Sequence, residues 1–350
     1  MSIELTKEET LSLKGIAIIL MICLHFFCTT GNTMIAEGKV DFLFTLFRQF
    51  ATHGLACLAI FSFITGYGYC ALSAREPRAP FAAGLHRLRS FYPFFAFMCT
   101  LYFCLGHLFP YEGGLKPEDW SFFPKNLTGI HGTIPDYWYI RVVLVSALLY
   151  FPILLAAKRV SPRVHTWILF GLIVATYAAR MADLLSPVLL SYGTSIRHII
   201  HHGAFLALWM HFFLAGYTLR YYTESPSIGL LLLAILATAI CYSQAGTSTF
   251  ILMASICSIK ILPSSVNAVL FFFGTYSTCM WLNHRLIFGY WFSSFFYSLP
   301  TPVNIALLIL LSLATSYIIT NAWHKITEGA PKKEPGNPEK PTKDKLHVTN

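Results

Sequence analysis

Ten long apolar stretches, separated by short polar segments, dominate the pattern of hydrophobic and polar positions along this chain. Most are about 20 residues long, the length that an α-helix needs to cross the hydrocarbon core of a bilayer. Few charged residues interrupt them. The pattern predicts an all-α, polytopic membrane helix bundle of about ten transmembrane helices, near residues 11–29, 51–72, 91–109, 137–157, 165–185, 201–220, 227–243, 247–262, 266–290 and 303–323.

Basic residues are distributed unevenly between these stretches. If the N-terminus is cytoplasmic, one side of the membrane carries Arg75, Arg78, Arg87, Arg89, Lys158, Arg159, Arg163, Arg220 and Lys260. Because Lys and Arg concentrate in cytoplasmic loops, that side is predicted to be the cytoplasm, with both termini facing it. The segment 110–136, which falls on the opposite side, carries several acidic residues, in agreement with this orientation.

Composition divides the chain into two parts. Residues 1–325 form the predicted integral-membrane domain. Residues 326–350 are rich in Pro, Lys and Glu and have too little apolar surface to fold alone, so they are predicted to form a disordered cytoplasmic tail. The absence of an internal sequence repeat argues against the inverted halves found in many transporters.

Overall composition supports the membrane assignment. The chain is 55% hydrophobic and only 12% charged, whereas a soluble domain has about 25% charged residues. The net charge of +9 could suggest a nucleic-acid partner, but in a membrane protein it reflects basic cytoplasmic loops and anionic lipid. We therefore expect a multi-pass protein of the cell inner membrane that contacts the lipid bilayer and binds no nucleic acid.

Two polar side chains interrupt the first apolar stretch, LSLKGIAIILMICLHFF at 11–27. Lys14 and His25 are eleven residues apart, so on a helix they differ by about 20° around the axis and about 16 Å along it. They share one face, with the lysine at the cytoplasmic boundary and the histidine deeper. A lysine at a helix end can simply reach the headgroups, and a histidine can simply bond a neighbouring helix. Spacing alone leaves a structural and a functional role equally open.

The other ionisable groups narrow the possible chemistry. The predicted spans contain one carboxylate, Asp183, so acid/base chemistry by paired carboxylates lacks its components. Histidine is then the candidate base. His198, His201 and His202 have a spacing that suits zinc, but no nearby carboxylate or thiolate completes a site, and no metal site is predicted.

Five motifs occur in order along the chain. Lys14-x10-His25 is the first, and the others are FSFITGYGY (61–69), HRLRSFYPFF (86–95), DYWYIRVVLVSALLYFPIL (136–154) and GTYSTCMWLNHRLIFGYWF (274–292). Together they resemble the membrane acyltransferase 3 family. This chain has lysine where that family's first signature has arginine, and Thr65 where its second span has serine. The resemblance covers about residues 10 to 323 and implies an integral-membrane O-acyltransferase.

The resemblance also implies a reaction and two catalytic roles. Members of the family move an acyl group, commonly acetyl, from cytoplasmic acyl-CoA to a carbohydrate on the far side of the membrane, such as an exopolysaccharide or O-antigen. Their signature histidine is the catalytic base and their signature arginine is required, which implies these roles for His25 and Lys14. Acyl-CoA is then a co-substrate, and no permanently bound cofactor is expected.

Candidate residues for binding the substrates follow from residue type and position. Arginine forks suit phosphate, so the candidate CoA site is the basic cluster Arg87, Arg89, Arg75 and Arg78, although a cytoplasmic loop would be basic in any case. Trp138, Tyr139 and Arg141 lie near the outer edge of the fourth span. They are candidates to contact substrate or the reaction's oxyanion, and an aromatic belt at the membrane interface accounts for them equally well.

The ninth span adds three residues on the face of Gly274: Ser277, Trp281 and His284, at helical spacings of three and four. Ser277 and Trp281 are predicted to contact substrate, although Ser277 also suits simple helix packing. His284 is predicted to be catalytic, either by orienting the acceptor or by relaying a proton.

A permease or exporter of a glycan precursor on the same scaffold is the alternative function. An outward-facing cavity lined by aromatic residues would bind sugar by stacking in either case. The two predictions differ in one respect, because a permease has no reason to bind CoA. The acceptor, the acyl chain and the oligomeric state are not predicted.

Overall fold

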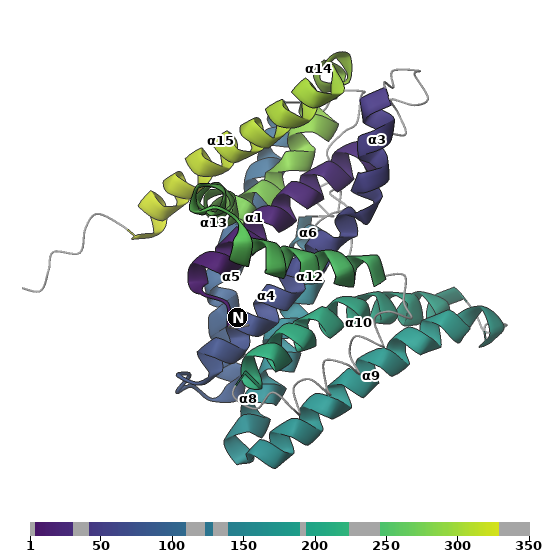
Figure 1. The fold of residues 1–350 in the computed structure, drawn as a ribbon, viewed down its shortest axis with the longest axis vertical. Coiled ribbons are helices and arrows are strands. Elements are labelled where there is room, and N and C mark those ends of the chain that lie inside the picture. The colour runs from purple at the N-terminus through teal and green to yellow at the C-terminus, as the bar shows by residue number, and fades with distance from the viewer. Residues whose placement is uncertain are drawn as a thin grey trace, which may run out of the picture.

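The computed structural model describes residues 4–30, 42–109, 123–128, 139–189, 194–223 and 246–328. Every regular element within these ranges is helical (Figure 1), which confirms the all-α prediction. The elements are α1 (Lys7–Leu24), η1 (His25–Thr30), α3 (Phe42–Ala51), η2 (Thr52–Leu55), α4 (Ala56–Ser73), α5 (Pro80–Leu108), α6 (Phe123–Thr128), α7 (Ile140–Val145), η6 (Ser146–Tyr150), α8 (Phe151–Val160), α9 (Pro162–Leu189), α10 (Thr194–Tyr221), α12 (Gly246–Ile261), α13 (Ser264–Leu286), η7 (Ile287–Trp291), α14 (Ser293–Ser298) and α15 (Thr301–Glu328).

Five helical segments are long and apolar enough to cross a membrane: Lys7–Cys28, Phe42–Ser73, Pro80–Leu108, Ile140–Val160 and Thr301–Thr327. They correspond to the first four expected spans and the last. Helices α9, α10, α12 and α13 occupy four more expected spans, while 227–243 lies outside the described residues. The ten crossings and the orientation of the termini therefore stay predictions. So does the disordered tail, because α15 continues to Glu328 and the described residues end there.

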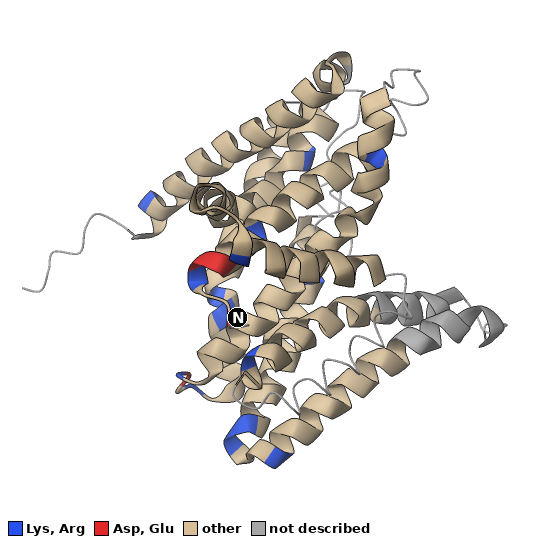
Figure 2. Ribbon diagram, viewed as in Figure 1, with Lys and Arg blue, Asp and Glu red and all other residues tan. Residues whose placement is uncertain are grey.

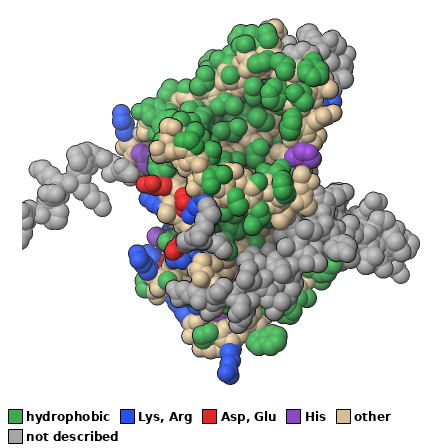
Figure 3. Space-filling model, viewed as in Figure 1, with side chains coloured by type: hydrophobic (Ala, Val, Ile, Leu, Met, Phe, Trp, Pro, Cys, Tyr) green, Lys and Arg blue, Asp and Glu red, His purple; other side chains and the backbone are tan. Residues whose placement is uncertain are grey.

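The surface of the bundle is mostly apolar. Hydrophobic side chains cover much of the face shown in Figure 3, and the basic residues gather mainly along one edge (Figure 2). Phe42, Trp167 and Leu310 have 79%, 72% and 60% of their surface exposed. So many exposed large apolar side chains suit a lipid environment, and the apolar helices are those of a membrane protein.

Two glycines bring α1 and α13 into backbone contact. A Cβ atom on Gly15 would lie 2.1 Å from the carbonyl oxygen of Leu270, and one on Gly274 would lie 1.8 Å from that of Leu11. No other residue fits at either position without displacing a helix. Small residues are the usual means by which membrane helices approach closely, and here they hold the first and ninth expected spans together.

A second pair of glycines joins α4 to α10. A Cβ atom on Gly66 would lie 1.8 Å from the carbonyl oxygen of Phe213, and one on Gly216 would lie 1.9 Å from that of Phe63. Helix α9 packs beside α10 on its other side (Figure 1). The structure thus contains two close helix pairs, α1 with α13 and α4 with α10, and α1 also packs against α4.

Candidate functional site

Two histidines that are 259 residues apart in the chain form a hydrogen bond across α1 and α13. Nδ1 of His25 lies 2.7 Å from Nε2 of His284. The two rings are stacked, with their centres 5.0 Å apart and their planes 9° from parallel. His284 is fully buried, and its Nδ1 lies 2.9 Å from the carbonyl oxygen of Met280.

If both rings are neutral, these two hydrogen bonds assign their protons. A carbonyl oxygen only accepts, so Nδ1 of His284 donates to Met280 and its Nε2 is the acceptor. Nδ1 of His25 then donates to that Nε2, and the lone pair of His25 lies on its own Nε2. In this arrangement Nε2 of His25 can accept a proton, and the bond to His284 holds its ring in place.

Both helices that carry the histidine pair change from α-helix to π-helix next to it. The π-helix η1 begins at His25 itself, and η7 begins at Ile287, three residues after His284. Single π-helical turns within α-helices are rare and are frequent at functional sites. Nothing in the residue pattern predicts either turn.

A cavity of about 330 Å³ lies between α1, α4, α5, α7 and α13. Aromatic and aliphatic side chains form most of its wall, and two cations are part of it. The lining residues are Lys14, Met21, Phe61, Thr65, Tyr69, Leu72, Arg87, Ser90, Phe91, Tyr139, Val143, Ser277, Thr278 and Trp281. Five of these were predicted site residues: Lys14, Arg87, Tyr139, Ser277 and Trp281.

The cavity is elongated along α4. Its wall includes Leu72 and Phe61, which are eleven residues and so about 16 Å apart on that helix. Lys14 and Met21 line it from α1 at a spacing of seven residues, which places them on one face.

The histidine pair lies beside the cavity and does not line it. His25 follows the lining residue Met21 by four positions, and His284 follows the lining residue Trp281 by three. Each histidine is therefore one helical turn beyond a residue of the wall, on the same side of its helix. Lys14 lies in the cavity wall, and His25, which is predicted to share its helix face, lies just beyond the wall.

Lys14 faces this apolar cavity with no hydrogen-bond or ion-pair partner within the described ranges. Its side chain is only partly exposed, and the other basic residue of α1, Lys7, lies seven positions earlier. Because an ammonium group in such surroundings is costly without a counter-charge, the cavity favours an anionic ligand at this end.

Arg87 is the one residue of the predicted basic cluster that lines the cavity. Its Nη2 lies 2.8 Å from Oε2 of Glu76, whose Oε1 accepts from Nη1 of Arg78, also at 2.8 Å. Burial opposes ionisation of Glu76, but hydrogen bonds from Arg78 and the charges of both arginines outweigh it and hold the pKa of Glu76 below its usual value. Arg75 and Arg89 are exposed and lie outside the cavity wall.

Some of the predicted substrate-binding residues line the cavity and others do not. Tyr139 and Trp281 meet edge to face, with ring centres 5.6 Å apart, and both line the cavity. Ser277 also lines it, but its hydroxyl donates to a carbonyl of its own helix at 2.8 Å. Arg141 is half-buried on α7 and is not part of the wall. Trp138 lies outside the described residues, as do the side chains of the three histidines with zinc-like spacing.

Several lining residues were not identified from the sequence. Tyr69 and Thr65 could have been identified, because both lie in the FSFITGYGY motif at a spacing of four, on one helix face. Thr278 is the neighbour of a predicted residue, and Ser90 follows the basic cluster. Glu76, which holds two of the predicted arginines, was missed because a lone carboxylate in a basic loop gave no signal that it would be buried.

No curated protein and no solved structure matches the chain. Residues 12–321, which include both histidines and the whole cavity wall, match the family described as an acyltransferase domain. This chain therefore belongs to the membrane acyltransferase 3 family, and it is a membrane acyltransferase.

Proposed function

We propose that this protein is an O-acyltransferase of the cell inner membrane that moves an acyl group, acetyl in the simplest case, from cytoplasmic acyl-CoA to a hydroxyl of an extracytoplasmic carbohydrate. One observation carries the proposal. The wall of a single cavity contains two cations, Lys14 and Arg87, and its helices continue within one turn to the hydrogen-bonded pair of His25 and His284.

The cations and the apolar wall match the two parts of the donor. The phosphates of CoA bind at Arg87, whose guanidinium forms charge-assisted bonds to phosphate oxygen, and Lys14 supplies a second positive charge. The acyl-pantetheine arm then lies along the apolar surface formed by Phe91, Met21 and Trp281, which leads towards the histidines. Glu76 holds Arg87 in place for this contact through its ion pair with Nη2.

His25 acts as the general base at Nε2. As the acceptor oxygen attacks the thioester carbonyl, its proton passes to Nε2, a carbon–oxygen bond forms, and negative charge collects on the carbonyl oxygen. When the carbon–sulfur bond breaks, the CoA thiolate leaves and takes the proton back from His25. The hydrogen bond to Nε2 of His284 orients the ring and stabilises the imidazolium between these two steps.

The transient oxyanion needs a hydrogen-bond donor. Trp281 belongs to the cavity wall three residues before His284, and its indole N–H is a donor only. We assign it to the oxyanion, with Arg141 on α7 as a longer-range positive charge. Donors of this type contribute about 3–4 kcal/mol of transition-state stabilisation where they are pre-positioned.

Binding and transfer of labelled acetyl-CoA by the purified protein test the proposal. We expect saturable binding that Arg87→Gln weakens about tenfold, as loss of one charge-assisted hydrogen bond would. Lys325→Gln, which removes an exposed cation from α15, is the matched control and should bind as the wild type does. A protein that transports a glycan precursor without binding acetyl-CoA would contradict the proposal and support the permease.

Further, a mass profile of surface glycans from cells with and without the protein would identify the acceptor. We expect the loss of a mass equal to one acyl group per modified sugar. Identical profiles would contradict a carbohydrate acceptor, even if the protein bound acetyl-CoA.

A further inference from the structure

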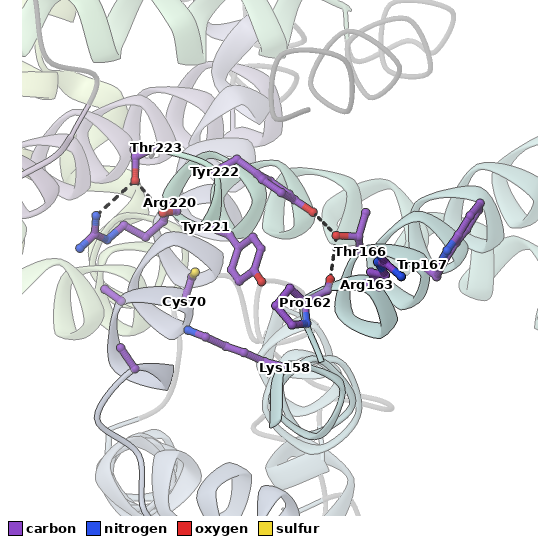
Figure 4. Close-up of a pocket in the computed structure, with 12 residues that line it drawn as sticks. Cys70, Lys158, Pro162, Arg163, Thr166, Trp167, Arg220, Tyr221, Tyr222 and Thr223 are labelled. Carbon is purple, nitrogen blue, oxygen red and sulfur yellow. Dashed lines mark hydrogen bonds between the residues drawn. The ribbon is translucent and has the colours of Figure 1, made fainter. Parts of the chain in front are cut away.

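A second, larger cavity of about 720 Å³ lies at the ends of α4, α8, α9 and α10. It is on a different face of α4 from the acyl cavity, since Cys70 and Ala74 line this one and Tyr69 and Leu72 line the other. The lining residues that the structure describes are Cys70, Ala71, Ala74, Lys158, Pro162, Arg163, Thr166, Trp167, Arg220, Tyr221, Tyr222 and Thr223 (Figure 4). The proposed acyl transfer uses none of these residues.

The lining residues within the described ranges include three cations and no carboxylate. Nζ of Lys158 donates to the hydroxyl of Ser73 at 2.9 Å and lies 5.6 Å from the ring centre of Tyr221. Arg220 pairs with Glu4 at 2.8 Å. Arg163 is exposed and has no ion-pair partner in the part of the chain that the structure describes. At least two of the three positive charges are therefore available to an anion.

A hydroxyl group and a helix end add to this preference. The hydroxyl of Thr166 donates to the carbonyl of Pro162 at 3.0 Å and accepts from Tyr222 at 2.7 Å, so neither of these two groups donates to a ligand. The hydroxyl of Tyr221 points into the hollow beside Lys158 (Figure 4). The wall also includes the first turn of α9, where Pro162 and Arg163 lie. The positive end of that helix's dipole acts in the same direction as the three cations.

An apolar strip beside the cavity distinguishes between the possible anions. Trp167 belongs to the wall and has 72% of its surface exposed, and Val164 and Ile168 on the same helix are 39% and 37% exposed. A soluble phosphate or nucleotide would use the basic cavity but not the apolar strip. A phospholipid would use the cavity for its anionic headgroup and the strip for its apolar acyl chains.

We propose that this cavity binds the headgroup of an anionic phospholipid. The lipid phosphate lies between Lys158 and Arg163, and the acyl chains run along the exposed strip of Val164, Trp167 and Ile168. The bound lipid then ties α9 to α4 and α10 at the edge of the bundle where the basic residues collect (Figure 2).

Thermal unfolding of the full-length protein in detergent micelles, with and without added phosphatidylglycerol, tests the proposal. We expect phosphatidylglycerol to raise the unfolding temperature, and phosphatidylcholine at the same fraction to leave it unchanged. In Arg163→Gln the same shift should need about tenfold more phosphatidylglycerol, as expected for one lost charge-assisted hydrogen bond. Because Arg163 is exposed and makes no ion pair within the described ranges, this variant should fold normally.

Lys325→Gln is the matched control, since it removes an equal charge away from the cavity, and it should respond as the wild type does. An equal response of Arg163→Gln and wild type would overturn the site. If inorganic phosphate or CoA produced the phosphatidylglycerol shift, and Arg163→Gln removed it, the site would belong to a soluble anion and the lipid proposal would be wrong. None of these outcomes depends on acyl transfer.

Discussion

The contact between α1 and α13 offers a direct way to separate the two histidines without touching either of them. Gly15 and Gly274 each lie ten residues before a histidine, His25 and His284 respectively. Ser12 also meets Asn267 through a hydrogen bond of 3.2 Å, so the two helices run in the same direction from the glycines to the histidines. A change at the glycine contact is therefore transmitted along two parallel helices.

The perturbation is Gly274→Ala. Its Cβ atom would lie 1.8 Å from the carbonyl oxygen of Leu11, and contacts under 3.0 Å are essentially never made, so the helices must separate by at least 3.0 − 1.8 = 1.2 Å. If the full displacement reached the histidine pair, the distance of 2.7 Å would become 2.7 + 1.2 = 3.9 Å, beyond the limit of a hydrogen bond. Misplacement of a catalytic group by about 1 Å costs about 100-fold in rate.

The assay is the initial rate of acyl transfer by purified protein, with thermal unfolding measured on the same samples. We expect the rate of Gly274→Ala to fall about 100-fold, with about 1–3 kcal/mol lost from stability through overpacking. Gly171→Ala is the matched control, because a Cβ atom there meets nothing within 4 Å, and it should retain the wild-type rate. A folded Gly274→Ala protein that transfers at the wild-type rate would refute this account of how the pair is held.

Three further changes test other parts of the structure. His284→Gln should lower kcat about 10- to 100-fold with little change in KM, because it disturbs the orientation of the base and not the binding of the donor; an unchanged kcat would remove His284 from the mechanism. Lys14→Met should raise KM for acetyl-CoA about tenfold while Lys14→Arg restores it, and equal KM values in both variants would exclude a role for the charge. Glu76→Gln should cost about 1–2 kcal/mol of stability, less than a fully buried pair because Arg78 is 45% exposed. Since the pKa of Glu76 is lowered in the folded protein, its contribution is complete above the usual carboxyl pKa of 4.5 and is lost as the pH falls through the lower folded-state value. Unfolding temperatures across that acidic range should therefore fall more steeply in wild type than in Glu76→Gln, and parallel curves would contradict the assignment.

The helices and their faces could be predicted from the sequence, because both follow from local pattern. The apolar period placed Lys14 on one face of α1, and the spacings of three and four placed Ser277 and Trp281 on one face of α13; all three line the cavity. Such predictions need only the geometry of a single helix.

The contact between helices could not be predicted in the same way. Whether His25 reaches His284 depends on packing between the first and ninth expected spans, and the nearest signal in the sequence is a glycine ten residues before each histidine. Likewise, four arginines were equivalent as a charge cluster. The structure distinguishes them because one buried carboxylate, Glu76, pairs with Arg78 and Arg87, and of these two only Arg87 lines the cavity. Burial of a lone acidic residue is a property of the folded loop and has no local pattern.

The central claim is that the imidazole of His25 takes the proton of the acceptor hydroxyl. The most direct measurement is the rate of acyl transfer from labelled acetyl-CoA by His25→Ala, beside His53→Ala, which replaces an exposed histidine in η2. We predict that His25→Ala still binds acetyl-CoA but transfers acyl groups about 100- to 10,000-fold more slowly, the usual contribution of a general base, while His53→Ala keeps the wild-type rate. Transfer by His25→Ala at the wild-type rate would contradict the claim.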